Sequence, residues 1–167
     1  MHPIIDFAEH TLGVKLYPGQ AEALNAYYES GKRNWLLLSG RRGGKSLLSD
    51  IITIYEAVIP NLDQYIRPGE ERYVLMVSVR EDSARVHIRQ ITKLMRHDKN
   101  LGAMIQAVKE DRVELKNGVI ILSLPASARA ARGYTASTLV MDEAAFFVDT
   151  LGNSSACLLY TSPSPRD

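Results

Sequence analysis

The stretch Trp35-Leu36-Leu37-Leu38-Ser39-Gly40-Arg41-Arg42-Gly43-Gly44-Lys45-Ser46 decides the fold. It begins with a continuous apolar run, 35–38, which predicts a strand buried on both faces. A glycine-rich turn follows, and a helical stretch then covers 45–59 and ends at Pro60. A strand, a glycine-rich turn and a helix in this order are the context that a phosphate-binding loop, or P-loop, requires.

Each residue type in the turn suits the binding of a nucleotide phosphate. Gly40, Gly43 and Gly44 let the backbone curl, so that its N–H groups and the start of the next helix point at phosphate oxygens. We expect Lys45 to reach the β- and γ-phosphates and the hydroxyl of Ser46 to coordinate Mg²⁺. Serine stands at position 39, where the strict motif has glycine. The alternative is a glycine-rich turn that happens to contain Lys-Ser.

A second motif lies further along the chain. Residues 139–141 are apolar and predict a buried strand, and Asp142 and Glu143 follow directly. An Asp at this strand end holds Mg²⁺ in P-loop enzymes, so Asp142 is assigned to the metal. A neighbouring carboxylate can deprotonate the attacking water, so Glu143 is assigned as the general base. The alternative for the pair is a helix start, where acidic residues are favoured.

The rest of the chain alternates predicted strands and helices. The further elements are a helix within 16–28, a buried strand at 73–77, an amphipathic helix at 81–96, and strands at 112–115 and 119–124 around an Asn117-Gly118 hairpin turn. This alternation predicts an α/β domain with a mostly parallel sheet. With the two motifs above, it predicts the three-layer sandwich of a P-loop NTPase that binds ATP and Mg²⁺.

Composition excludes several classes of protein. The chain has 167 residues, of which 46% are hydrophobic, and a net charge of +1, as in a globular domain. This charge does not indicate nucleic-acid or membrane binding, so any DNA contact must come from a local basic patch. No apolar stretch approaches the ~20 residues of a membrane helix. The start lacks a signal-peptide pattern, and the single cysteine, Cys157, cannot form an internal disulfide, so a cytoplasmic setting fits.

The final segment, 157–167, has neither helical nor strand periodicity. It resembles the translation of a transposase adapter used in sequencing libraries, and a native flexible tail is the alternative. We therefore expect 157–167 to be non-native. On this interpretation 1–156 is a partial P-loop ATPase domain, truncated after the acidic strand, and the gene continues beyond Ala156.

The motifs resemble those of one family. The loop 39–46 with its two arginines, together with Met141-Asp142-Glu143-Ala144-Ala145-Phe146, is similar to the ATPase domain of the large terminase subunit of tailed bacteriophages. The resemblance covers 16–147 and implies a motor that hydrolyses ATP to move double-stranded DNA into procapsids. It implies double-stranded DNA, a portal protein and a small terminase subunit as partners, a homo-oligomer, and residence in the host cytoplasm, transiently at the procapsid portal. The family's coupling motif and nuclease domain are missing from this sequence.

The resemblance also implies roles for four further residues. Arg41 matches the loop arginine that would sense or stabilise the γ-phosphate, and Arg42 lies beside it in the binding loop. A solvated loop tip is the alternative for both. Leu16-Tyr17-Pro18-Gly19-Gln20 is similar to the adenine-side motif of the family, in which Gln20 would read the adenine edge and Tyr17 would pack on the ring. A simple helix-start turn is the alternative.

Basic residues within 81–96 offer a surface for DNA. Arg85, Arg89, Lys93 and Arg96 share one helix face and could contact phosphates, with a solvated face as the alternative. Arg129 and Arg132, in a loop of small residues, could act on a neighbouring subunit's ATP, on DNA, or only at the surface. The four histidines have no metal-ligand spacing and receive no role.

Two other functions fit the same motifs. A helicase-like ATPase would share the glycine-rich loop and the acidic pair but would act on nucleic acid without a capsid. A nucleotide-binding fragment would bind ATP and have no motor activity. The sequence beyond the acidic strand would separate the first two, and a turnover assay would identify the third.

Overall fold

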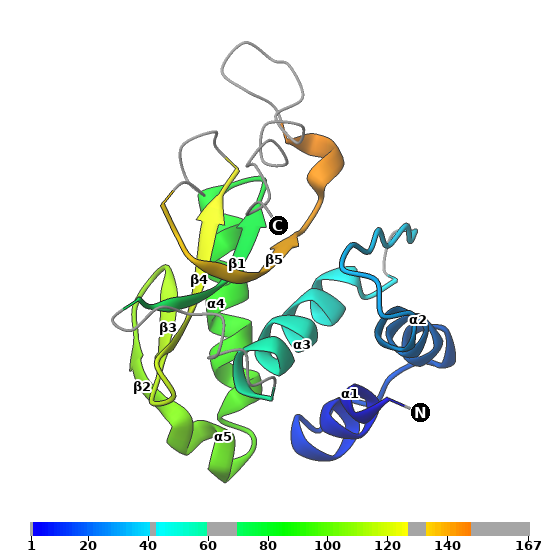
Figure 1. Ribbon diagram of the computed structural model, residues 1–167, viewed down its shortest axis with the longest axis horizontal. Helices are drawn as coiled ribbons and strands as arrows, with labels where there is room; N and C mark the ends of the chain where they lie inside the picture. Colours follow the sequence, from blue (N-terminus) through cyan, green and yellow to red (C-terminus); the bar gives the residue numbers. More distant parts are fainter. Residues whose placement is uncertain (1, 41–42, 60–69, 127–132, 148–167) are drawn as a thin grey trace.

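The computed structural model describes residues 2–40, 43–59, 70–126 and 133–147 (Figure 1). Its helices are α1 (Pro3–Asp6), continued by a π-helical turn (Phe7–Thr11), α2 (Pro18–Glu29), α3 (Lys45–Val58), α4 (Glu81–Met95) and α5 (Lys99–Met104). Its strands are β1 (Arg72–Ser78), β2 (Ile105–Val108), β3 (Arg112–Leu115), β4 (Val119–Pro125) and β5 (Ala136–Met141), followed by a 3-10 turn (Ala144–Phe146). The predictions for Arg41, Arg42, Arg129, Arg132 and the tail 157–167 lie outside the described residues.

The five strands form one mixed sheet in the order β2-β3-β4-β1-β5. β1 pairs in parallel with β4 and with β5, while β3 pairs antiparallel with β2 and β4. The sheet therefore has a parallel core and an antiparallel edge, which confirms the α/β class. The hairpin predicted at Asn117-Gly118 joins β3 to β4, and Gly118 has a φ of 81°, a left-handed conformation that favours glycine.

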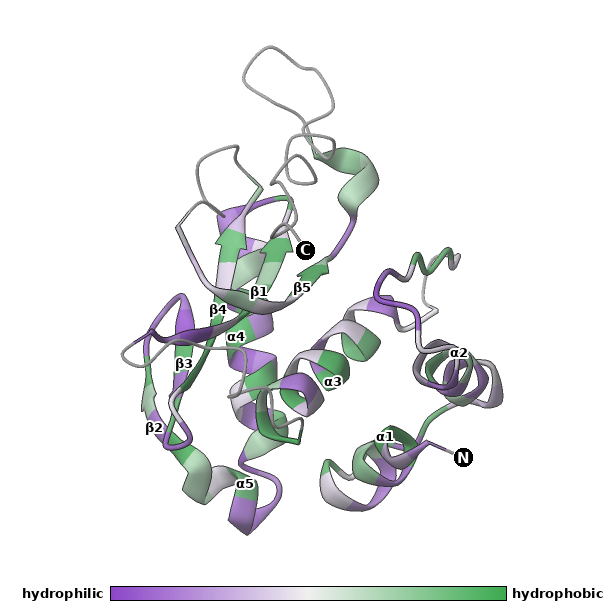
Figure 2. Ribbon diagram, in the orientation of Figure 1, coloured by the Kyte–Doolittle hydropathy of each residue, from purple (hydrophilic) through white to green (hydrophobic). Residues whose placement is uncertain are grey.

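The helices described here pack on one face of the sheet. α3 contacts α4 on one side and the N-terminal helices on the other, where the ring of Tyr55 lies against Phe7 and Tyr28 (Figure 1). Val74 and Met76 of β1 share a single buried core with the apolar sides of these helices. The strands of the sheet are mainly apolar, whereas α4 alternates apolar and polar residues as an amphipathic helix does (Figure 2).

The opposite face of the sheet carries a smaller cluster. Leu75, Ile120 and Leu122 are buried there, and the rings of Tyr73 and Tyr134 partly cover them. No helix packs on this face within the described ranges, so the part of the chain that they cover has two layers. The three-layer arrangement predicted from the sequence is therefore not observed in the described residues.

The strand predicted at 35–38 is wrong. Leu36 and Leu38 are 77% and 83% exposed, and the segment 34–40 has no regular secondary structure and pairs with no strand. Trp35 and Leu37 pack against the core, and the indole of Trp35 stacks on Tyr27 with ring centroids 4.9 Å apart. A strand needs a hydrogen-bonded neighbour. Among the described residues the sheet ends at β5, which pairs with β1 alone, and no strand pairs with 34–40.

Among the described residues, no helix combines the length and the apolar character that crossing a membrane requires.

Candidate functional site

The glycine-rich turn before α3 has the conformation that its glycines permit. Gly44 is the N-cap residue of α3 and has a φ of 77°, which is strained for any residue with a Cβ. The backbone N–H of Gly43 donates to the carbonyl oxygen of Gly40 at 3.3 Å and closes the turn. A side chain on Gly43 would collide with the hydroxyl of Ser39. The turn therefore requires glycine at both positions before the helix.

The side chain of Lys45 lies back over this turn. Its Nζ donates to the carbonyl oxygens of Ser39 at 2.8 Å and of Gly40 at 3.1 Å. Backbone carbonyls are neutral acceptors, and an ammonium group bonds more strongly to an anionic oxygen. The ammonium of Lys45 is thus held beside the turn and can exchange its carbonyl partners for a phosphate.

The structure brings the glycine-rich turn and the acidic pair together. Ser46, at the start of α3, donates from Oγ to Oδ2 of Asp142 at 2.9 Å, although the two residues are 96 positions apart. The backbone N–H of Asp142 donates to the carbonyl oxygen of Val77, which fixes the residue at the end of β5. Hydrogen bonds from His87 and from Ser46 lower the pKa of Asp142 despite partial burial. Asp142 is therefore held as a carboxylate next to a hydroxyl.

Two residues that sequence reasoning missed complete this arrangement. His87 of α4 places Nδ1 2.6 Å from Oδ1 of Asp50, and Nε2 3.2 Å from Oδ2 of Asp142. His87 and Asp50 are only 5% and 3% exposed. Burial alone would lower the pKa of His87, but hydrogen bonds to Asp142 and Asp50 raise it to about 9. His87 thus lies between the buried carboxyl group of Asp50, whose pKa is raised by burial, and the partly buried carboxylate of Asp142.

A signal for both residues was present in the sequence. Asp50 follows Ser46 by four positions, so the two side chains share one face of α3. His87 lies between Ala84 and Ile88 on the apolar side of α4, where a polar residue needs a buried partner. Only the tertiary structure shows that the two positions meet.

Glu143 has an unusual backbone conformation. Its φ of 57° and ψ of 37° put it in the left-handed region, and it is the only residue other than glycine with a positive φ among the described residues. The side chain is exposed, and the 3-10 turn Ala144–Phe146 follows. Strained residues of this kind concentrate at functional sites. Glu143 does not begin an α-helix, which was the alternative for the acidic pair.

A cavity of about 410 Å³ adjoins these groups. Its polar lining residues include Ser46, Asp50, Ser78, His87, Asp142 and Glu143. The hydroxyl of Ser78 is buried and has no hydrogen-bond partner among the described residues. The cavity is thus a polar space between α3, α4 and the ends of β1 and β5, with an unpaired hydroxyl at its wall.

The oxygen atoms of Ser46 and Asp142 are too few to hold a metal that takes all its ligands from the protein, but they suit Mg²⁺. Within the described ranges, no three His, Cys, Asp or Glu side chains cluster as a metal site. Mg²⁺ is usually bound by one or two protein oxygens, completed by phosphate oxygens and water. The hydroxyl of Ser46 and the carboxylate of Asp142 form such a partial set, close to the glycine-rich turn.

The adenine-side motif stays a prediction, and the structure shows what its residues contact in the protein. Gln20 accepts from the backbone N–H of Tyr17 at 3.0 Å and donates to the carbonyl oxygen of Gly43 at 3.1 Å. The first contact is that of a helix cap, which was the alternative interpretation. The second contact ties α2 to the glycine-rich turn. The ring of Tyr17 is 74% exposed and has no stacking partner in the described part of the chain.

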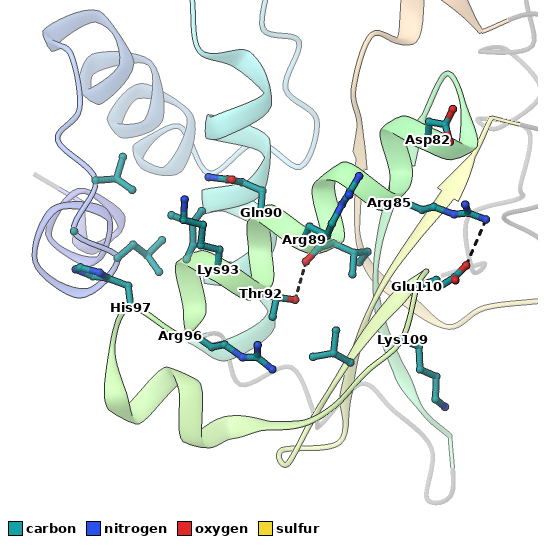
Figure 3. A pocket seen from close by; sticks show the side chains of 16 residues that line it. Asp82, Arg85, Arg89, Gln90, Thr92, Lys93, Arg96, His97, Lys109 and Glu110 are labelled. Carbon is teal, nitrogen blue, oxygen red and sulfur yellow. Dashed lines mark hydrogen bonds and ion pairs between the residues drawn. The ribbon is translucent and has the colours of Figure 1, made fainter.

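A second cavity, of about 1030 Å³, runs along α4 (Figure 3). Arg85 forms ion pairs there with Glu81 at 2.8 Å and with Glu110 at 3.4 Å. Three further cations, Arg89, Lys93 and Arg96, are exposed, and no described acidic side chain pairs with them. The basic face expected for this helix is thus exposed in a groove, which we call the basic groove.

Comparison of the chain with protein-family models gives no match, and no curated protein and no solved structure matches it.

Proposed function

We propose that this chain is an ATP-binding and ATP-hydrolysing P-loop domain, and that it acts in a DNA-packaging motor of the large-terminase type. The observation that carries the ATPase proposal is the hydrogen bond between Ser46 and Asp142. Two motifs that lie far apart in the sequence, each expected to hold Mg²⁺, meet at one point beside a glycine-rich turn. A turn that contained Lys-Ser by chance would have no reason to lie beside the acidic pair.

Each residue of the site has a separate role in the hydrolysis of ATP. The backbone N–H groups of 44–46, at the start of α3, bind phosphate oxygens. Lys45 leaves the carbonyl oxygens of Ser39 and Gly40 and donates to the β- and γ-phosphates. Ser46 and Asp142 would hold Mg²⁺, which would neutralise negative charge on the phosphates.

Glu143 supplies the base of the reaction. Its exposed carboxylate follows Asp142 directly and lines the same cavity, so it can accept a proton from a water that attacks the γ-phosphate. The resemblance assigns the γ-phosphate to Arg41 as well. Positively charged side chains held near the phosphoryl oxygens stabilise their transition-state charge. Lys45 is such a side chain among the residues that the structure describes.

The motor part of the proposal rests on the terminase-like motifs and on the basic groove. Nucleic-acid backbones are bound chiefly by Lys and Arg that neutralise phosphates. Arg89, Lys93 and Arg96 are exposed along one helix and have no acidic partner among the described side chains, so they can form such contacts. We propose double-stranded DNA as the partner, with portal protein, small terminase subunit and further copies of the chain in the complete motor.

A turnover assay on the full-length protein tests the ATPase proposal. Lys45→Ala should lower the rate of ATP hydrolysis by about 100-fold or more, since it removes a cation from the transferring phosphate. Lys116→Ala, at the exposed β3–β4 turn, is the matched control and should leave turnover unchanged. Equal rates for the two variants would refute the site. DNA-stimulated turnover that fills no procapsids would favour the helicase-like alternative.

A further inference from the structure

His87 links the candidate metal ligand to the interior of the domain. Its two ring nitrogens contact carboxylates on different elements, Asp50 on α3 and Asp142 after β5. With the hydroxyl of Ser46, the groups form a continuous chain Asp50–His87–Asp142–Ser46 that ties α3, α4 and β5 together. Both ends of this chain lie on α3, four residues apart.

A contribution to stability alone does not explain these linked side chains. His87 and Asp50 are almost wholly buried, on helix faces whose other buried side chains are mainly apolar. Buried ionic groups lose hydration, and apolar residues of similar volume often replace them without loss of stability. A role in the candidate site at Asp142 would explain why His87 and Asp50 occupy these buried positions.

The geometry shows what that role is. The hydroxyl of Ser46 and Nε2 of His87 both meet the same oxygen of Asp142, Oδ2. Two donors that converge on one oxygen fix the orientation of a carboxylate. Asp50 in turn shares a hydrogen bond with Nδ1, which fixes the rotation of the imidazole ring. Groups that orient a metal ligand in this way strengthen metal binding although they do not touch the metal.

We propose that His87, held by Asp50, is a positioning residue that orients Asp142 for Mg²⁺. The inference rests on the proposed function, because it takes Asp142 as a metal ligand. It goes further by giving the site a support on α4, an element that neither motif contains. Ser46 alone cannot hold the carboxylate throughout, since its hydroxyl is itself expected to bind the metal.

Mn²⁺ binding to the full-length protein, followed by electron paramagnetic resonance with a non-hydrolysable ATP analogue present, tests this proposal. His87→Ala should weaken Mn²⁺ binding by about 10- to 100-fold, the range for residues that orient a metal ligand. His87→Gln carries an amide donor near the place of Nε2 and should restore most of the affinity. Binding of the analogue in EDTA should be unchanged in both. His10→Ala, at an exposed helix end, is the control.

The outcomes separate this proposal from the proposed function. Unchanged Mn²⁺ affinity in His87→Ala would overturn the proposal for His87. The proposal would also be overturned if His87→Ala and His87→Gln lost Mn²⁺ affinity equally and both bound the ATP analogue more weakly in EDTA, because that result marks a purely structural role. If His87→Ala does not fold, the variants His87→Gln and Asp50→Asn test the proposal instead. Wild-type Mn²⁺ affinity in His87→Gln with a clear loss of Mn²⁺ affinity in Asp50→Asn supports it, and any other pair of results overturns it. A wild-type protein without metal-dependent nucleotide binding would instead refute the proposed function.

Discussion

Glu143 allows a prediction that separates the effect of its backbone conformation on stability from the effect of its carboxylate on activity. Its left-handed backbone, with φ 57° and ψ 37°, costs a residue with a Cβ about 1–2 kcal/mol. Glycine adopts this conformation freely but loses about 0.5–1 kcal/mol more than alanine when the unfolded chain is ordered. Taking the midpoints of these two ranges, we therefore expect Glu143→Gly to be more stable than Glu143→Ala by about 0.75 kcal/mol.

The comparison of these two variants isolates the backbone. Both remove the carboxylate and its repulsion from Asp142, so that difference cancels, and both should lose ATP hydrolysis because the general base is absent. At about 2–4 °C per kcal/mol for a domain of this size, the melting temperature of Glu143→Gly should exceed that of Glu143→Ala by about 1.5–3 °C.

Differential scanning calorimetry of the ATPase domain's transition, with turnover measured on the same samples, checks this prediction. Equal melting temperatures, or a more stable alanine variant, would refute the left-handed conformation of Glu143. Full turnover in either variant would refute its role as the base. A glycine variant that is more stable and inactive would mean that the carboxylate is retained at a cost to stability.

Two further predictions separate the functional groups. Glu143→Gln should bind Mg·ATP normally and fail to hydrolyse it, whereas Asp142→Asn should weaken Mg²⁺ binding. Metal titrations with turnover assays check both, and normal hydrolysis by Glu143→Gln would exclude Glu143 as the base. Removing Arg89, Lys93 and Arg96 together should reduce the salt dependence of DNA binding, with the slope of log K against log salt falling by about 1 for each phosphate that the variant no longer neutralises. An unchanged slope would exclude the basic groove as a DNA-binding surface. The control is a triple alanine variant of exposed lysines outside the groove, Lys15, Lys32 and Lys116.

Local sequence patterns predicted much of the fold. The helix predicted at 45–59 is observed as Lys45–Val58, and the one predicted at 81–96 as Glu81–Met95, because both carry an apolar face and clear boundary residues. The Asn117-Gly118 turn fixed the β3–β4 hairpin, since few dipeptides adopt its backbone conformation as readily. The expected meeting of Ser46 with Asp142 is also found.

The features that were missed depend on contacts between distant segments. The apolar run 35–38 has the composition of a strand, but a strand also needs a neighbour, and composition cannot supply one. β2, Ile105–Val108, is a short edge strand that only alternates partly buried and exposed residues, a weak pattern in four residues. His87 and Asp50 lie 37 positions apart, and only the packing of α4 on α3 makes them partners.

The central claim is that one Mg·ATP site forms between the turn at 43–46 and the acidic pair. A crystal structure of the full-length protein with Mg²⁺ and a non-hydrolysable ATP analogue tests it most directly. We predict the β- and γ-phosphates at the backbone N–H groups of the turn, the ammonium of Lys45 on a phosphate oxygen instead of on the carbonyl oxygens of Ser39 and Gly40, and Mg²⁺ beside Ser46 and Asp142. A nucleotide bound elsewhere, with Lys45 still on those carbonyl oxygens, would contradict the claim.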